Sequence, residues 1–392
     1  MNTQKIKFNK QEFAGAFGDI GTDFPLIVAM ILAANLHAPS VLIVYGLMQI
    51  LTGLTYKIPM PVQPLKAMAT LVIAQKIAGP VLLGAGLSIG VVMLFLSLTG
   101  LLDKLTKLVP KAVIRGLQLG LGISLCSLAC KEYIAADKLW GYVLAFGAFL
   151  IVIFFIDNKK LPASILVIGL GFLYAFIVNV DFQALFQAVG ISFPRTTVPT
   201  VEDVSKGFVL LALPQIPLSL GNSIMATKQV TSDLFPERTD LTVKKIGITY
   251  SLMNLIVPFV GGVPVCHGAG GMIGHYTFGG RTGGSVIIYG LLYIGIGVFF
   301  GNSFEEVIKV FPLPILGMIL LVEGISLMLL VKDTVQDKKG FVIAILVGAL
   351  AFGLPYGFMV SMLVGTALYY LPVRLDALKY LGASSQEKTL NQ

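Results

Sequence analysis

The sequence predicts an all-α, polytopic membrane protein with about 14 spans arranged as two inverted repeats of seven. Composition is the first observation: 56% of the 392 residues are hydrophobic and only 12% are charged, against about 25% charged residues in soluble domains. The second is a pair of Pro- and Gly-rich interruptions at matching places in the two halves, residues 59–66 and 263–271. The third is an internal sequence repeat at a nearly constant offset.

Most predicted spans are apolar runs of about 20 residues, the length needed to cross a bilayer. The third and tenth are short because each follows one of the interruptions, and we expect each to be a half-helix preceded by an extended segment. The first contains Asp19, Asp23 and Pro25, so it does not resemble the plain apolar core of a signal peptide. In chain order the predicted spans are 12–34, 39–56, 63–77, 80–102, 112–129, 138–156, 161–179, 204–227, 241–258, 265–276, 283–301, 311–331, 339–354 and 356–372.

The internal repeat divides the chain into two halves of seven spans. Pro110 and Gly122–Leu125 recur 202 positions later as Pro312 and Gly324–Leu327. The two interruptions align at an offset of 203 positions. An odd number of spans per repeat inserts the second copy upside down. The predicted units are a first repeat at 1–180, an external connection at 181–203, a second repeat at 204–373 and a cytoplasmic tail at 374–392.

The charge distribution predicts the orientation in the membrane. In the fourteen-span arrangement, 21 of the 28 Lys and Arg residues fall on the side of the N-terminus and five on the other side. Because cytoplasmic loops are enriched in Lys and Arg, both termini are expected in the cytoplasm, in a plasma or inner membrane. The net charge of +8 is explained by this asymmetry. The bilayer is therefore the expected partner, and no nucleic acid is expected.

The two interruptions predict an anion site. A helix N-terminus has unpaired N–H groups and about half a positive charge, so two half-helices that begin near mid-membrane would both attract an anion. A desolvated dianion needs further donors. The candidate binding residues are Gln63, Lys66, Gln215, Ser219, Asn222 and His267, with the backbone of Gly268 and Gly270.

Each of these side chains also has a structural interpretation. Lys66 either acts on the anion, more through its charge than by contact, or extends to the cytoplasmic surface. Gln215 and Asn222 either line the site or form hydrogen bonds between helices. The His267 ring either donates to an oxyanion or is a satisfied structural histidine.

The carboxylates within the spans have two interpretations as well. Asp19 is either the proton acceptor of a symporter, which makes it the proton-coupling candidate, or a static partner for Lys66 or for helix ends. Asp23 is expected to be structural. Glu323 has the same two interpretations as Asp19, and the structural one is favoured.

Cofactor and enzyme chemistry are not expected. Cys126, Cys130 and Cys266 are an odd set in apolar segments, which gives no disulfide framework. No His or carboxylate accompanies Cys126 and Cys130, so no metal site is predicted. The chain contains no nucleophile–base pair and no phosphate-binding loop in a suitable context, so it is not expected to be an enzyme.

Five motifs carry a family resemblance: Phe17–Thr22, Pro59–Ala67, Pro264–Gly271, Ser232–Arg238 and Phe278–Gly283. They resemble the MOT-type molybdate transporter family, which looks like a distant branch of the SulP sulfate permeases. The resemblance runs over nearly the full chain. It implies core and gate domains built from seven-plus-seven inverted repeats, with an oxyanion bound between the third and tenth helices.

The function expected from these observations is secondary active transport of a tetrahedral oxyanion, molybdate before others. Sulfate remains open because the two anions share charge and shape. Proton-coupled import is expected because an inward-moving dianion opposes a negative-inside potential, and a homodimer is expected by analogy. A nucleobase permease of the same fold would need acidic residues on the eighth and tenth spans, where Gln215, Asn222 and His267 stand instead. An anion channel is the remaining alternative.

Overall fold

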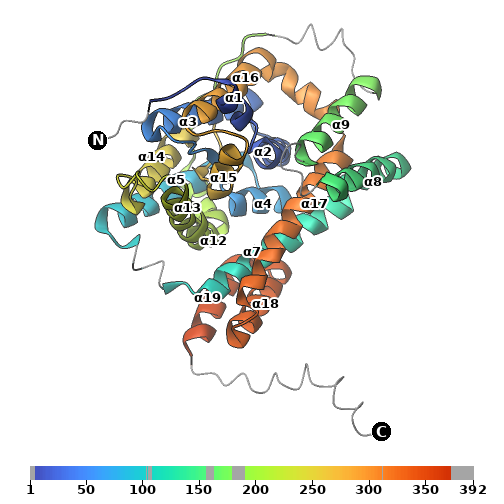
Figure 1. Cartoon of the computed structure of the whole chain (residues 1–392). Helices are drawn as coiled ribbons and strands as arrows, with labels where there is room; N and C mark the ends of the chain where they lie inside the picture. Colours follow the sequence, from blue (N-terminus) through green and yellow to red (C-terminus); the bar gives the residue numbers. More distant parts are fainter. Residues whose placement is uncertain are drawn as a thin grey trace, which may run out of the picture.

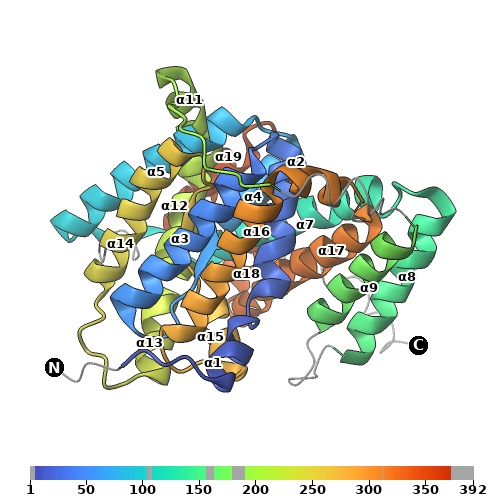
Figure 2. The same ribbon diagram turned by 90° about the horizontal axis from the view of Figure 1, so that it is seen from above.

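Two groups of helices lie side by side in the computed structural model (Figure 1). The larger, here called the core group, contains α1–α5 and α11–α16, and the smaller, here called the flanking group, contains α7–α9 and α17–α19. In the perpendicular view of Figure 2, α8 and α9 of the flanking group lie at one side of the molecule, and α18 and α19 overlap the core group. The structure describes residues 5–102, 104, 108–155, 163–178, 190–310 and 312–371. Residues 181–189 of the predicted connection and the predicted tail lie outside this part.

The core group is formed by both halves of the chain. Its first-half elements are α1 (Lys10–Ala16), α2 (Ile20–Ala34), α3 (Ala38–Tyr56), β1 (Val62–Pro64), α4 (Lys66–Gln75) and α5 (Gly79–Thr99). Its second-half elements are α11 (Val201–Gly207), η2 (Phe208–Ala212), α12 (Leu213–Leu218), η3 (Ser219–Ala226), α13 (Thr227–Leu234), α14 (Val243–Ile256), η4 (Val257–Val260), β2 (Val265–His267), α15 (Ala269–Thr277) and α16 (Gly284–Val310).

The flanking group also combines segments from both halves. Its elements are α7 (Lys111–Leu128), η1 (Ala129–Tyr133), α8 (Lys138–Phe155), α9 (Ala163–Val178), α17 (Leu313–Leu329), η5 (Leu330–Thr334), α18 (Lys338–Gly353) and α19 (Gly357–Tyr370). Eight helices in the described residues are long and apolar enough to cross a membrane, and three more are apolar but shorter. The chain is therefore mostly helical and built for a membrane.

Two predicted spans are not single α-helices. The first is interrupted at Phe17–Asp19, between α1 and α2, so Asp19 precedes a helix instead of lying within one. The eighth becomes a succession of α- and π-helical segments from Val201 to Leu234. Pro214 and Pro217 lie in this stretch, and a proline removes the N–H that would close the regular helical ladder.

The two interruptions fold as predicted, into extended segments followed by short helices. Strands β1 and β2 pair antiparallel, with Val62 opposite His267 and Pro64 opposite Val265. The prolines of both segments lack an N–H and favour an extended conformation in the residue before them, which prevents a continuous helix. α4 follows β1 and α15 follows β2, so the N-termini of both half-helices lie at the same small sheet.

Glycines bring several helix backbones into direct contact. A Cβ added at Gly46 of α3 would lie 2.4 Å from the carbonyl oxygen of Gly290 in α16, and one at Gly53 would lie 2.8 Å from that of Gly283. In the flanking group, a Cβ at Gly122 of α7 would lie 2.5 Å from the Gly324 carbonyl oxygen of α17. Only glycine permits approaches this close, which are a frequent packing device between membrane helices.

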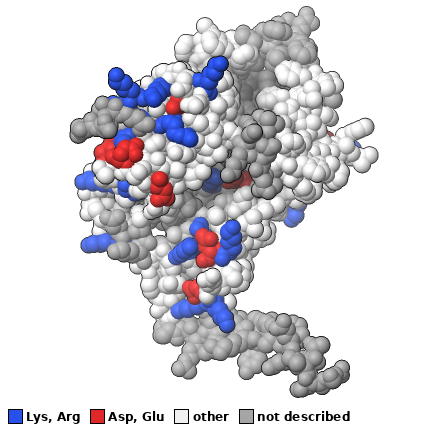
Figure 3. Space-filling model, in the orientation of Figure 1, with Lys and Arg blue, Asp and Glu red and all other residues white. Residues whose placement is uncertain are grey.

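The surface is apolar over large areas. Large hydrophobic side chains of α8 are mostly exposed, among them Trp140, Phe146 and Phe154. Such a face is typical of contact with lipid. On the face seen in Figure 3 the charged side chains form small clusters separated by uncharged surface.

Candidate functional site

Two buried side-chain amides fix the backbone of the paired strands. The Val62 N–H donates to Oε1 of Gln49 (2.9 Å), and Nε2 of Gln49 donates to the Val62 carbonyl (2.7 Å). In the second half, the Val265 N–H donates to Oδ1 of Asn254 (2.9 Å), and Nδ2 of Asn254 donates to the Val265 carbonyl (2.6 Å). Both amides are fully buried. Each clamps one strand at both of its polar backbone groups, which a strand in an apolar interior must satisfy.

We expect Asn254→Leu to destabilise the protein more than Gln49→Leu. The first change leaves the N–H and the carbonyl of Val265 without these partners, at about 1–3 kcal/mol each. In the second, the Val62 carbonyl keeps the Tyr45 hydroxyl at 2.6 Å, which shares its proton between this oxygen and Asp23. Thermal unfolding of the detergent-purified variants measures both losses. Equal stability of the two variants would contradict the clamp geometry.

Gln215 caps the first half-helix. Its Oε1 accepts hydrogen bonds from the backbone N–H groups of Ala67 (3.0 Å) and Met68 (3.2 Å) in the first turn of α4. Its Nε2 donates to Ser219 Oγ (3.0 Å), which lies 2.8 Å from the Tyr250 hydroxyl. Two of the N–H groups at the start of α4, where an anion is expected from the sequence, are therefore hydrogen-bonded to Gln215. Gln215 lies between Pro214 and Pro217 in α12, and its side chain reaches the first turn of α4.

Asp19 lies against the first turn of the second half-helix. Gln63 Nε2 donates to both of its carboxylate oxygens, each at 2.8 Å. A Cβ added at Gly271 of α15 would lie 2.1 Å from Asp19 Oδ2, and one at Gly268 would lie 2.2 Å from Gln63 Oε1. These contacts support the interpretation of Asp19 as a partner of a helix end. They also direct the amide nitrogen of Gln63 toward Asp19.

Lys66, the first residue of α4, pairs with Glu323 of α17. Their Nζ and Oε1 atoms are 2.7 Å apart. Asp23 is buried and accepts a hydrogen bond from Tyr45, which fits its predicted structural role.

His267 is completely buried at the end of β2. Its Nε2 lies 2.7 Å from Thr249 Oγ1 and 3.4 Å from the Tyr56 hydroxyl, and its ring packs edge to face against Tyr56. Its Nδ1 has no hydrogen-bond partner among the described residues. The ring is thus anchored on one side and has unused hydrogen-bonding capacity on the other.

A cavity of about 380 Å³ lies between the half-helices and the flanking group. This volume is in the range of about 300–1,000 Å³ that is usual for small-molecule sites. Two cationic residues line it, Lys66 and Arg115, and no Asp or Glu is among the described residues that do. Its other lining residues are Gln63, Ala67, Gln118, Leu121, Gln215, Leu218, Ser223, Ala226, Cys266, His267, Gly268, Ala269, Gly270, Leu327 and Leu330.

Three residues of this cavity have buried nitrogens without a hydrogen-bond partner in the described structure: Arg115 Nε, Gln118 Nε2 and His267 Nδ1. Such atoms are rare because each costs free energy, and they often mark functional sites. Arg115 and Gln118 come from the first turns of α7, in the flanking group. The sequence predicted neither, because a basic residue near the end of a span is normally an interfacial anchor.

The cavity brings together six of the eight predicted binding residues: Gln63, Lys66, Gln215, His267, Gly268 and Gly270. Ser219 is fully buried behind Gln215 and is not among the lining residues. The side chain of Asn222 lies outside the described part of the structure. Within that part, no group of three or more His, Cys, Asp or Glu residues could hold a metal ion.

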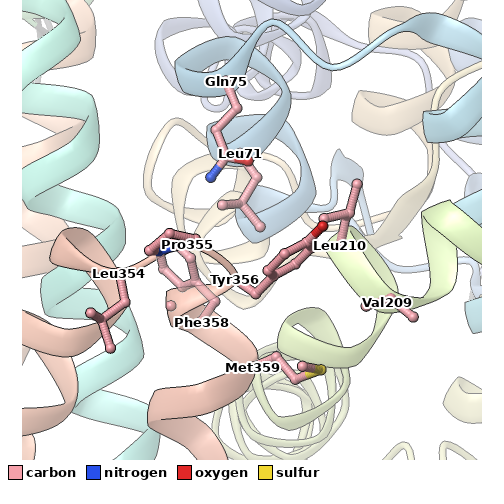
Figure 4. A pocket seen from close by; sticks show the side chains of 10 residues that line it. Leu71, Gln75, Val209, Leu210, Leu354, Pro355, Tyr356, Phe358 and Met359 are labelled. Atoms are coloured by element: carbon pink, nitrogen blue, oxygen red, sulfur yellow. The ribbon is translucent and has the colours of Figure 1, made fainter.

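A second cavity, of about 390 Å³, lies near the C-terminal end of α4 (Figure 4). Leu71 and Gln75 of α4 face it, opposite Tyr356 and neighbouring residues of the α18–α19 turn. It contains none of the predicted site residues. Helix α4, ten residues long, therefore extends from one cavity to the other. Both cavities lie between the two groups of helices.

The fold and this cationic cavity define a multi-pass membrane protein with the features of an anion transporter. A family described as "Molybdate transporter of MFS superfamily" matches residues 11–125 and 207–327. The chain belongs to this molybdate transporter family. It is 31% identical over 383 residues to Molybdate transporter 2 of Arabidopsis thaliana, covering 85% of this chain and 81% of that protein. Molybdate transporter 1 of Chlamydomonas reinhardtii is 26% identical over 455 residues, with 88% of each chain covered.

Solved structures share the fold. The transmembrane domain of the cyanobacterial bicarbonate transporter BicA superposes with a TM-score of 0.66 at 16% identity, covering 94% of this chain and 99% of that domain. SLC26A9 superposes with a TM-score of 0.67 at 13% identity, covering 92% of this chain and 64% of that chain. These similarities, together with the molybdate transporter relatives, support anion transport, and the relatives are membrane transporters, not enzymes.

Proposed function

We propose that this protein is a secondary active transporter that imports molybdate. The observation that carries the proposal is the cavity at the paired half-helices, which two cations line and to which no described carboxylate contributes. Gly268, Ala269 and Gly270 also line it, and this supports a site for the anion beside the electropositive start of α15. The names of the plant and algal relatives supply molybdate as the substrate.

In the proposed site, the anion lies between the first turn of α15 and the Lys66 side chain. His267 presents its unpartnered nitrogen, and Gln63 and Gln215 hold the two half-helices in place. Arg115 and Gln118 add donors from the flanking group. Several donors are needed because a dianion loses a large hydration free energy on entering such a cavity.

Transport is proposed to proceed by alternating access between inverted repeats. The core group would carry the anion, and the flanking group would act as the gate. The equivalent contacts of Gln49 and Asn254 support the repeat. Gln49 bonds to the N–H and carbonyl of Val62, and Asn254, 205 positions later, bonds in the same way to Val265, which lies 203 positions after Val62. We propose fourteen spans and cytoplasmic termini on the basis of the Lys and Arg asymmetry.

Coupling to protons is proposed from the charge balance. Moving one charge against a membrane potential costs about 2.3 kcal/mol per 100 mV, so import of a dianion requires at least two co-transported cations to be electroneutral. Asp19, buried beside the half-helices, is the candidate carrier of one proton. Asp19→Asn should then flatten the dependence of uptake on pH, and an unchanged pH response would remove Asp19 from this role.

Uptake of labelled molybdate into proteoliposomes tests the function. We expect saturable uptake that tungstate and sulfate inhibit and uracil does not, with faster uptake when the external pH is lowered. Protein-free liposomes and the Lys66→Met variant are the controls. Inhibition by uracil without uptake of molybdate would favour a nucleobase permease, and sulfate uptake with no molybdate uptake would reassign the substrate.

A further inference from the structure

Two ion pairs join the core and flanking groups, and both involve α4. At its start, Lys66 pairs with Glu323 of α17 at 2.7 Å. Just after its end, Lys76 pairs with Glu132 of η1 at 2.9 Å. The ion pairs that Asp333, Glu202 and Asp240 form each lie within one group. The half-helix is thus attached to the flanking group at both ends.

The two pairs differ in their surroundings. The Lys66 and Glu323 side chains are 37% and 17% exposed, and those of Lys76 and Glu132 are 66% and 49% exposed. Lys66 lines the cationic cavity, whereas Lys76 does not. An anion in that cavity therefore interacts strongly with the first pair only, because exposed charges at the other end of α4 are screened by solvent.

We propose that Glu323 is a positioning residue that competes with the transported anion for Lys66. This inference rests on the proposed function. A dianion that accepts a hydrogen bond from the Lys66 ammonium lies close to the Glu323 carboxylate and repels it. Binding of the anion therefore weakens the ion pair, and the loaded core group loses one of its two ionic attachments to the flanking group.

The competition makes Glu323 a determinant of affinity. With Glu323 present, part of the attraction between Lys66 and the anion is used to separate an existing ion pair. The carboxylate also excludes weakly charged anions, because a monovalent anion offers less Coulomb energy for the same exchange. Glu323 belongs to α17 of the flanking group, whereas Lys66 and both half-helices belong to the core group, so their ion pair links the two groups.

Direct binding of molybdate to the purified protein in detergent tests the proposal. Glu323→Gln keeps the size of the side chain and removes its charge. We expect this variant to bind molybdate about fivefold more tightly, because it no longer has a partly exposed ion pair to separate on binding. Glu132→Gln is the matched control, because it breaks the other pair, and it should leave the affinity unchanged. Glu323→Asp should bind with near wild-type affinity.

A double-mutant cycle separates this role from a general structural one. Lys66→Met should weaken binding by at least roughly tenfold, and adding Glu323→Gln to Lys66→Met should raise the affinity by clearly less than Glu323→Gln does alone, because only direct repulsion is then relieved. An unchanged affinity of Glu323→Gln, or an increase of the same size with and without Lys66, would overturn the proposal. If the wild-type protein bound no molybdate, tungstate or sulfate, the proposed function would fail, and this inference with it.

Discussion

Replacing Gly271 with alanine is expected to reduce molybdate uptake to less than about a tenth of the wild-type rate. The new Cβ would lie 2.1 Å from Asp19 Oδ2 and 2.8 Å from Pro61 Cγ. Asp19 cannot simply rotate away, because Gln63 holds both of its oxygens. Overpacking of this kind costs about 1–3 kcal/mol. Here the strain would displace β1 and α15, the two elements that shape the cavity.

Gly295→Ala is the matched control for this experiment. It adds the same methyl group to α16, at a position that does not line the cavity and where a Cβ meets no atom within 4 Å. We therefore expect most of the uptake activity to remain. Wild-type uptake by Gly271→Ala, or equal losses in both variants, would contradict the close contact between Asp19 and α15.

Gln215→Leu is expected to abolish anion binding and to lower the stability of the protein. It leaves the N–H groups of Ala67 and Met68 without their acceptor, and each unsatisfied buried group costs about 1–3 kcal/mol. The start of α4 would then rearrange, and Lys66 with it. Thermal unfolding and molybdate binding of the purified variant measure the two effects.

Gln215→Glu separates stability from binding. Its carboxylate keeps an acceptor oxygen at the start of α4, where negative charge is favourable, so most of the stability should return. The added negative charge lies at the cavity and repels the anion, so binding should remain weak. A leucine variant as stable as the wild type would show that Gln215 is not an essential cap, and tight binding by the glutamate variant would place the anion elsewhere.

Much of this fold follows from local sequence chemistry. The prolines at positions 59, 61 and 64 cannot continue a helix, and neither can Pro264, which a glycine-rich segment follows. Both extended segments and both half-helices were therefore predictable. The repeat offset placed the two interruptions at equivalent positions, and the structure pairs them as β1 and β2. Because this pairing brings the two interruptions together, six of the eight predicted binding residues line one cavity.

The contacts between distant segments were not predictable from the sequence. Gln49 and Asn254 are single amides in apolar helices, and nothing local indicates that each binds a strand that follows it. Arg115 lies near the end of a predicted span, where an interfacial position is the ordinary outcome. The partner of Lys66 could be Asp19 or Glu323 by hydropathy alone, and only the packing of α4 against α17 decides it.

The glycine contacts between α3 and α16 have a mechanical consequence. Gly46 and Gly53 face Gly290 and Gly283, so the same contact recurs after seven residues, or two helical turns. Helices whose main chains touch at two levels cannot slide past each other without steric overlap. The helix that carries Gln49, and through it the strand that shapes the cavity, is therefore coupled rigidly to the long helix α16 that packs against it. Any large relative movement of the two groups must leave this pair of helices intact and occur at the boundary between the core and flanking groups, where ion pairs and cavities take the place of touching backbones.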